Sequence, residues 1–416
     1  MSRKLLKELT LSITDGEHGT VSHDVDGVHL LLSAKNLVNG KVVVFSEERK
    51  ISYTDFWKIR SRTKLEKDDV LLSTTGTIGN IAIATECEHF DFNRDVAMIK
   101  CDKRKILPEY LYYYLLMPST QKRLMFRTKG GTQKHLYLAD IEGFEIDLPD
   151  MVEQQKIVRF LREIDDKIIT NCRINDNLEQ QIKQLYNYWF LQYNFPNQHN
   201  MPYKSSGGKI VYNNQLKKRI PENWSVVTLN TLCDILSGYS FQSNDYVDNG
   251  KYRLITIKNV QDSGVNLNVD NYINLLPAKL PDYCILKPEN ILMSLTGNVA
   301  RVGLMYDNNC LLNQRVALVK PKKAQNNSFL YALFKSDTIR ITLESLAIGT
   351  SQKNLSPIDA GNISIPYNES VVNAFSDLIE AKMKQIVRNS SENLSLCELR
   401  DWLLPMIMNG QATIDD

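Results

Sequence analysis

The sequence lacks the features that mark secreted, membrane-spanning and zinc-binding proteins. Its seven cysteines are scattered and form no C-x-x-C pair, which argues against a disulfide framework and against a zinc site. No stretch approaches the ~18–20 consecutive apolar residues of a membrane helix. The first residues, Met1–Lys7, have neither the long apolar core nor the cleavage site of a secretory signal. We therefore expect a cytoplasmic protein with reduced thiols and no membrane partner.

The chain also lacks a strong charge of either sign. Its 50 Lys and Arg residues and 48 Asp and Glu residues leave a net charge of +2 on 416 residues. Such a balance does not by itself indicate nucleic-acid binding, so any basic surface must be local. With 43% hydrophobic and 24% charged residues the composition is that of a globular protein, and the length predicts two or three domains.

Motifs of catalysis are missing or incomplete. No G-x-S-x-G and no Asn-Pro-Pro-aromatic tetrapeptide occurs, and Ser206–Lys209 lacks the upstream glycine of a phosphate-binding loop. Pro149-Asp150 and Asp165–Lys167 fit a loose P-D…D-x-K nuclease pattern. Asp165–Lys167 fall in a predicted long helix, however, whereas such carboxylates normally lie at a sheet edge that can place a divalent ion. We predict no catalytic residue and no metal site, with a metal-dependent nuclease as an alternative.

The chain repeats itself. The matched segments keep their order, and their offset drifts only from 223 to 217 residues, which chance matches would not do. The pairs are Gly27–Leu37 with Gly250–Val260, Asp69–Gly76 with Asn290–Gly297, Asn93–Lys100 with Asn313–Lys320, Gly131–Leu136 with Gly349–Leu355 (one residue inserted), and Ile146–Pro149 with Ile363–Pro366.

Each half has the same predicted layout: short strands, a helix, a further strand and a long closing helix. We therefore predict an α+β fold of two similar domains with a pseudo-two-fold internal repeat and two long antiparallel helices. The expected parts are a first domain at 1–150, a central helix at 151–193, a turn-rich linker at 194–222, a second domain at 223–368 and a second long helix at 369–416.

Both long helices have a sustained 3–4 spacing of apolar residues, typical of a coiled-coil seam. Asparagines interrupt the middle of each seam, so an antiparallel pair would set one polar middle on the other. The alternative is ordinary helix packing inside one domain. The seam positions are Ile157, Leu161, Ile164, Ile168, Asn171, Asn175, Leu178, Ile182, Leu185 and Trp189 in the first helix, and Val372, Phe375, Ile379, Ile386, Asn389, Asn393, Leu396 and Leu403 in the second.

Basic residues gather locally in two places. One is the stretch between Glu109 and Asp140, which contains no acid and includes Gly130-Gly131. Glycines let the backbone approach a phosphate, and Lys or Arg supplies the charge. The other is 49–64, where basic and aromatic residues interleave, as they do on surfaces that bind nucleic acid. The alternative for both is a solvated charge run beside core aromatics.

Several segments resemble the specificity subunit of type I restriction–modification systems. Leu148–Val158, with its Pro and Glu-Gln-Gln, is similar to that family's strand-to-helix junction, and Tyr188–Phe190 to the end of its central helix. Ile220–Trp224 resembles the opening of its second target-recognition domain, and Leu399–Gly410 its C-terminal signature. The second junction, Pro366–Val372, lacks the Glu-Gln-Gln, so equal docking roles for the two junctions do not follow.

The resemblance implies two target-recognition domains separated by two antiparallel helices. Such a subunit binds a two-part site on double-stranded DNA and has no catalytic site of its own. It docks two methyltransferase subunits, which bind S-adenosylmethionine and methylate adenine, and a restriction subunit that uses ATP and Mg²⁺ can join. No cofactor is expected on this chain. Two unlike copies of one domain would account for two unlike half-sites.

We predict that the loop Gly130–His135 and its copy Ile348–Asn354 face DNA. The amides of Gln133, Gln352 and Asn354 carry the donor and acceptor that an adenine edge needs. A coiled-coil scaffold without DNA selectivity is the second alternative. The candidate DNA-binding residues are Arg60, Arg62, Arg94, Lys129, Gly130, Gly131, Thr132, Gln133, Lys134, His135, Arg301, Gln314, Thr350, Ser351, Gln352, Lys353 and Asn354.

Overall fold

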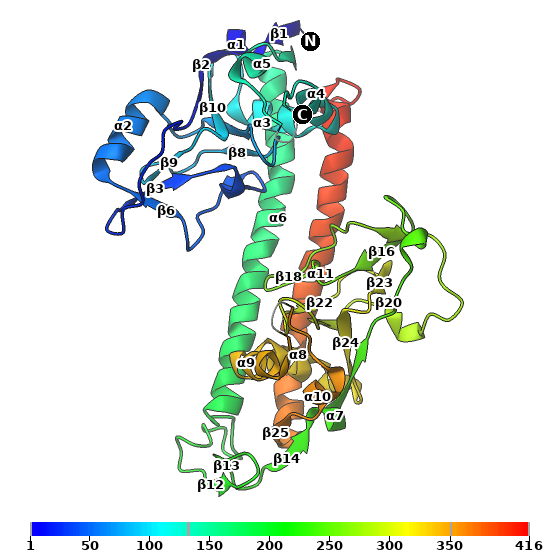
Figure 1. The fold of residues 1–416 in the computed structure, drawn as a ribbon. Helices are drawn as coiled ribbons and strands as arrows, with labels where there is room; N and C mark the ends of the chain where they lie inside the picture. Colours follow the sequence, from blue (N-terminus) through cyan, green and yellow to red (C-terminus); the bar gives the residue numbers. More distant parts are fainter. Residues whose placement is uncertain (1, 131–133, 350–351, 415–416) are drawn as a thin grey trace. The chain divides into compact units, whose positions relative to one another are not determined.

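The structure is a computed structural model that describes residues 2–130, 134–349 and 352–414. The chain divides into two compact units: unit 1 is Met1–Lys167 with Leu396–Asp416, and unit 2 is Ile168–Ser395. Each unit contains sheets and short helices together with a part of each long helix (Figure 1). Over the described ranges, no helix combines the length and the apolar character needed to cross a membrane.

Unit 1 is built on a four-stranded antiparallel sheet in the order β2-β10-β7-β8 and a three-stranded sheet in the order β6-β3-β9. Side chains of β7 alternate between two cores: Val70 and Leu72 pack with Tyr110, whereas Leu71 packs with Phe92. A two-residue hairpin pairs β4 with β5, and β1 pairs with β11. The strands are β1 (Ser2–Leu5), β2 (Thr10–Asp15), β3 (His29–Leu32), β4 (Leu37–Val38), β5 (Lys41–Val42), β6 (Arg49–Ile51), β7 (Val70–Ser73), β8 (Ile81–Ile83), β9 (Phe90–Phe92), β10 (Val96–Cys101) and β11 (Glu145–Leu148).

Unit 2 repeats this architecture. Its four-stranded sheet has the order β15-β24-β21-β22, and Val316 pairs with Ser294 just as Val96 pairs with Ser73 in unit 1. The second sheet again contains a parallel pair, β16 with β23. The strands are β14 (Ser225–Thr228), β15 (Cys233–Ser237), β16 (Tyr252–Ile255), β17 (Val260–Gln261), β18 (Gly264–Val265), β19 (Tyr272–Ile273), β20 (Ile285–Leu286), β21 (Ile291–Ser294), β22 (Val302–Leu304), β23 (Cys310–Leu312), β24 (Val316–Pro321) and β25 (Ser364–Tyr367). The predicted α+β duplication is thus confirmed.

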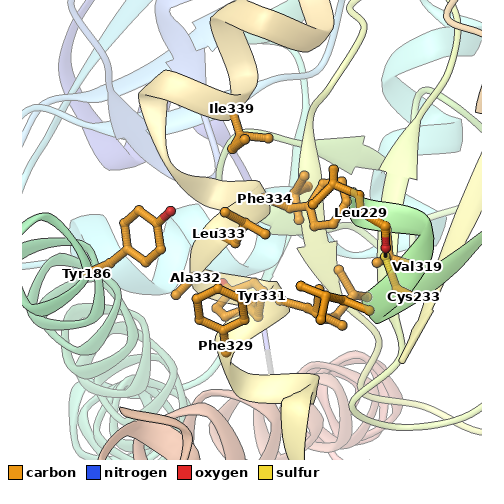
Figure 2. Close-up of a cluster of buried hydrophobic side chains, with 14 of the residues drawn as sticks. Tyr186, Leu229, Cys233, Val319, Phe329, Tyr331, Ala332, Leu333, Phe334 and Ile339 are labelled. Carbon is orange, nitrogen blue, oxygen red and sulfur yellow. Dashed lines mark hydrogen bonds between the residues drawn. The ribbon is translucent and has the colours of Figure 1, made fainter. Parts of the chain in front are cut away.

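Short helices complete both cores. In unit 2, α8 is buried on every side, because one face packs on the sheet and the other on the long helix. Figure 2 shows Phe329 and Tyr331 of α8 between Tyr186 of the long helix and Val319 of the sheet. The short α-helices are α1 (Leu6–Leu9), α2 (Tyr53–Thr63), α3 (Pro108–Leu116), α4 (Pro118–Phe126), α5 (Leu138–Glu142), α7 (Leu229–Leu232), α8 (Asn327–Lys335), α9 (Asp337–Leu346) and α10 (Pro357–Gly361).

The two long helices are α6 (Met151–Tyr186), which continues as a π-helical turn at Asn187–Leu191, and α11 (Glu369–Met408). All ten predicted seam positions of the first helix are buried or half-buried. Ile157 of α6 and Ile407 of α11 enter the core of unit 1, whereas Ile182 and Phe375 enter the core of unit 2. Each helix therefore serves two cores, and packing inside a single domain was the wrong alternative.

Paired amides join the polar middles of the helices within unit 2. Asn171 Nδ2 donates to Asn393 Oδ1 at 2.8 Å, and Asn389 Nδ2 donates to Asn175 Oδ1 at 2.8 Å. Rising numbers on α6 pair with falling numbers on α11, so the two helices are antiparallel. The prediction that one polar middle lies on the other is confirmed.

The segment 194–222, expected as a turn-rich linker, is more ordered than that expectation. It contains a hairpin of β12 (Ile210–Asn213) and β13 (Lys218–Pro221). Phe195 stacks on Tyr203 with ring centroids 4.7 Å apart and also packs against Trp224. Apolar side chains between the turns therefore pack the segment against the core of unit 2.

The amide pair predicts a coupled loss of stability. Asn389 is almost fully buried, so Asn175→Ala should leave its amide without an acceptor and cost about 1–2 kcal/mol. Asn389→Ala should cost a similar amount, and the double variant should cost clearly less than the sum. Asn177→Ala, at an exposed position of the same helix, is the matched control. Chemical denaturation measures all four free energies of unfolding, and strictly additive costs would contradict the pairing.

Candidate DNA interface

Three chain segments meet at the carboxyl end of β7 in unit 1. They are the turn after β7 (74–80), the turn between β9 and β10 (93–95) and the loop 129–135. Thr74 joins them, because its N–H donates to the carbonyl of Asp95 at 2.8 Å and its carbonyl accepts from the N–H of Leu136 at 3.0 Å. Residues distant in sequence thus form one cluster of loops on a rigid strand.

Unit 2 builds the same cluster at the carboxyl end of β21, from 295–301, 313–315 and 348–354. Leu295 takes the place of Thr74: its N–H donates to the carbonyl of Arg315 at 3.0 Å, and its carbonyl accepts from Leu355 at 2.8 Å. The repeat seen in the sequence is therefore a repeat of a surface as well as of a fold.

The third segment is closed identically in both units. Lys129 and His135 exchange two backbone hydrogen bonds of 2.8 and 2.9 Å, and Ile348 and Asn354 exchange two of 2.9 Å. The next residue is a glycine with positive φ in each case, +115° at Gly130 and +132° at Gly349.

The equal lengths correct the sequence alignment of these loops. Gly130, and not Gly131, corresponds to Gly349, and no residue is inserted. Lys134 is then the counterpart of Lys353, and His135 is the counterpart of Asn354. The inserted residue was an artefact of matching the wrong member of the Gly130-Gly131 pair.

Most described candidates on these loops are accessible to a ligand. Gly130, Lys134, Gln352, Lys353 and Asn354 are exposed, whereas His135 is half-buried and its Nδ1 bonds to Thr75 Oγ1 at 2.9 Å. Lys129 is exposed, with its Nζ 3.5 Å from a carboxylate oxygen of Asp140. The remaining loop candidates lie outside the described residues. They are Gly131, Thr132, Gln133, Thr350 and Ser351.

The turn between the strands holds two further candidates at equivalent positions, Arg94 and Gln314. Both side chains are exposed. The structure adds Arg315, also exposed, which stands where unit 1 has Asp95. Sequence reasoning missed Arg315 although the aligned triplets Asn93–Asp95 and Asn313–Arg315 contained the signal.

Arg60 was predicted to bind DNA, but the structure engages its side chain within the fold. Its guanidinium forms a 2.9 Å ion pair with buried Asp91 and donates to the carbonyls of Leu65 and Cys87. It also lies over the ring of Phe56, 4.9 Å from the centroid. These contacts occupy the charge and the donors inside the protein, so Arg60 fastens α2 to the sheet.

Two other predicted arginines neutralise neighbouring acids. Arg62 is 42% exposed and pairs with Asp15 at 3.4 Å and with Glu17 at 4.0 Å. Arg301 is less exposed, and its Nε lies 3.3 Å from a carboxylate oxygen of Asp262. Both side chains are thus engaged by acids, although Arg62 remains close to the turn 93–95 because the Glu17 carbonyl accepts the N–H of Arg94.

The carboxylate of the nuclease-like pattern is part of a structural contact. Asp165 forms a 2.8 Å ion pair with Arg400 and accepts a 2.7 Å hydrogen bond from the Tyr113 hydroxyl. Burial and this hydrogen bond hold the pKa of Tyr113 above its usual range. Within the described residues, no group of three or more His, Cys, Asp and Glu side chains could hold a metal ion.

Comparisons with known proteins agree with the duplicated fold. The model of the type I restriction modification DNA specificity domain matches the chain twice, at residues 27–180 and 221–387. The chain belongs to this family of specificity subunits. Two separate matches coincide with the two copies of the loop cluster, one in each unit.

Curated relatives have the same family identity. The MjaIX specificity subunit of Methanocaldococcus jannaschii is 25% identical over 92% of this chain and 87% of its own length. The HindI specificity subunit of Haemophilus influenzae is 20% identical over 85% of this chain and 88% of its own length. The crystal structure of an S subunit from M. genitalium, 16% identical, has a TM-score of 0.53 and covers 100% of this chain and 96% of its own, which supports the fold.

The reassignment of Arg60 predicts unequal effects for two arginines on one helix. Arg60→Ala should remove the partner of buried Asp91 and cost roughly 3–5 kcal/mol of folding stability. Arg62→Ala, which breaks partly exposed ion pairs and hydrogen bonds to the carbonyls of Asp15 and Gly16, should cost clearly less, about 1 kcal/mol. Urea unfolding of the two variants makes the comparison. Equal and small costs would show that Arg60 is not the fastening contact described above.

Proposed function

We propose that this specificity subunit reads a two-part DNA site through the two loop clusters, one cluster for each half. The observation that carries the proposal is that one backbone scaffold presents different exposed side chains in the two units. Because the two backbones are equivalent, each cluster would sit on its stretch of duplex in the same way. Because the side chains differ, the two clusters would read different bases.

The chemistry is proposed to lie on partner subunits. Two methyltransferase subunits would bind S-adenosylmethionine and methylate adenine in the recognised site, and a restriction subunit would use ATP and Mg²⁺ where it is present. The near-neutral charge of the chain fits this division, since partner subunits would supply many of the phosphate contacts. The chain itself would hold no cofactor and catalyse no reaction.

The two alternatives have less support. A nuclease built on Asp165 would need a carboxylate free to bind a metal, but Arg400 and Tyr113 already engage it. A scaffold without DNA selectivity would need nothing more than the paired helices. It offers no reason for both units to carry an exposed lysine at the same position of the same closed loop.

Removing the loop lysines tests the proposal. The complex of the chain with its methyltransferase subunit is titrated with a duplex that carries its target, found by mapping methylated adenines in cells that co-express the two. Lys134→Ala and Lys353→Ala should each weaken binding and lower the slope of log K against log salt by about 0.9, the value for one lost phosphate contact.

Lysines at the other ends of the same strands provide the matched control. Lys67 precedes β7 and Lys287 precedes β21, and both are exposed. Lys67→Ala and Lys287→Ala should leave affinity and salt slope unchanged. Unchanged affinity and slope for Lys134→Ala and Lys353→Ala would remove the loops from the interface, and equal binding of target and unrelated duplex by the wild-type complex would favour the scaffold.

A further inference from the structure

The two units differ in the side chains of one turn of the loop cluster, which lies between β9 and β10 in unit 1 and between β23 and β24 in unit 2. We infer that the turn residues Arg94, Gln314 and Arg315 determine which bases are read, whereas Lys134 and Lys353 hold phosphates. The inference rests on the proposed function and assigns separate roles within the same surface.

Backbone hydrogen bonds hold the two turns in the same conformation. The N–H of Arg94 donates to the carbonyl of Glu17 at 3.0 Å, and the N–H of Gln314 donates to the carbonyl of Tyr239 at 3.0 Å. Four further backbone hydrogen bonds recur at equivalent positions, so the conformation of the turn does not depend on the side chains of Arg94, Gln314 and Arg315. In unit 1 the backbone N–H groups of Asn93, Val96, Gly16 and Glu17 donate to the carbonyls of Leu32, Asn93, Val96 and Phe92. In unit 2 the N–H groups of Asn313, Val316, Gly238 and Tyr239 donate to the carbonyls of Ile255, Asn313, Val316 and Leu312.

In each unit a glycine lies against the backbone of the turn. A Cβ at Gly16 would lie 2.1 Å from the carbonyl oxygen of Asn93, and a Cβ at Gly238 would lie 2.4 Å from that of Asn313. Only glycine permits this approach, since a side chain would displace the backbone of the turn. Both units therefore hold the turn at the same place in the loop cluster.

The side chains on this common backbone are different. Unit 1 presents the guanidinium of Arg94, while the Asp95 carboxylate is occupied by a 2.8 Å hydrogen bond from the Asn93 amide. Unit 2 presents the carboxamide of Gln314 and, beside it, the guanidinium of Arg315, both exposed. The turn thus offers one chemistry to the first half-site and another to the second.

These chemistries match different bases. A guanidinium can donate two hydrogen bonds to O6 and N7 of guanine, and a glutamine amide can pair with N6 and N7 of adenine. The loop lysines are identical in the two units and so cannot distinguish unlike half-sites. A lysine also acts as a point charge, which suits the phosphate backbone common to every sequence.

The electrostatic surroundings of Arg94 support its access to DNA. Asp15 and Glu17 lie next to the turn in unit 1, and Arg62 pairs with both. Unit 2 has Ser237 and Tyr239 at the corresponding positions, so it needs no such counter-charge. Arg62 therefore acts as a positioning residue that removes acidic repulsion from the reading surface of unit 1.

Exchanging the turn residues tests the inference. Arg94→Gln and Gln314→Arg are each co-expressed with the methyltransferase subunit, and methylated adenines are mapped. Each variant should alter the preferred base in one half of the motif and leave the other half unchanged. Binding of the purified complexes to duplexes varied one base pair at a time should show a preference changed by roughly 5- to 150-fold at that position, since a bidentate contact discriminates by ~1–3 kcal/mol.

Lys134→Ala and Lys67→Gln complete the experiment. Lys134→Ala should lower the affinity for every duplex by the same factor and leave the methylated motif unchanged. Lys67→Gln should change neither the affinity nor the motif. If Arg94→Gln also lowers binding to every duplex alike, or if both exchanges keep the wild-type preference, the inference is overturned while the proposed function stands. If the wild-type complex methylates no two-part motif, the proposed function itself fails.

Discussion

Each long helix has apolar side chains at both ends and amides in its middle, and each apolar end has to be buried in a globular core. Ile157 and Leu161 of α6 belong to the core of unit 1, whereas Ile182 and Tyr186 belong to that of unit 2. The antiparallel amide pairs determine which residues of α11 face them. The register of the two helices thereby determines which helix side chains enter each core. The folding of either unit therefore depends on both helices.

The loop clusters show the same principle, because main-chain hydrogen bonds rather than the exposed side chains hold them together. Backbone bonds from Thr74 and Leu295 collect the three loop segments, and glycines at 16 and 238 allow the close approach that locks each turn. Because these contacts involve main-chain atoms, Arg94 can correspond to Gln314 without a change of fold. Such an arrangement suits a protein whose two domains would need equal geometry and unequal specificity.

Patterns local in sequence predicted much of this correctly. Residue spacing predicted the repeat, the α+β class, the seam of α6 and the contact between the polar middles of the two helices. Helical periodicity and duplication can both be recognised from the sequence alone. Arg94, Gln314 and the loop lysines Lys134 and Lys353 stay predictions of DNA contact: the aligned repeats place them at matched positions, and the structure shows that these side chains are exposed.

Features that the sequence did not reveal depend on tertiary contacts. Arg60 looked like a free basic residue, but its partner Asp91 lies 31 positions further along, on another element. The alignment of Gly130 with Gly349 rests on backbone closure and positive φ, which the pair Gly130-Gly131 hides. The segment 194–222 is ordered because apolar side chains such as Phe195 and Ile220 join the core of unit 2, and turn-rich composition alone does not reveal such packing.

The central claim is that two equivalent loop clusters face two different halves of one DNA site. Photo-crosslinking tests it most directly, with a photoreactive residue placed at 129 or at 348, the exposed and equivalent first positions of the two closed loops. In the assembled complex on its target duplex, the account predicts that position 129 crosslinks to one half of the site and position 348 to the other half. Crosslinks from both positions to the same half, or from neither position, would contradict it.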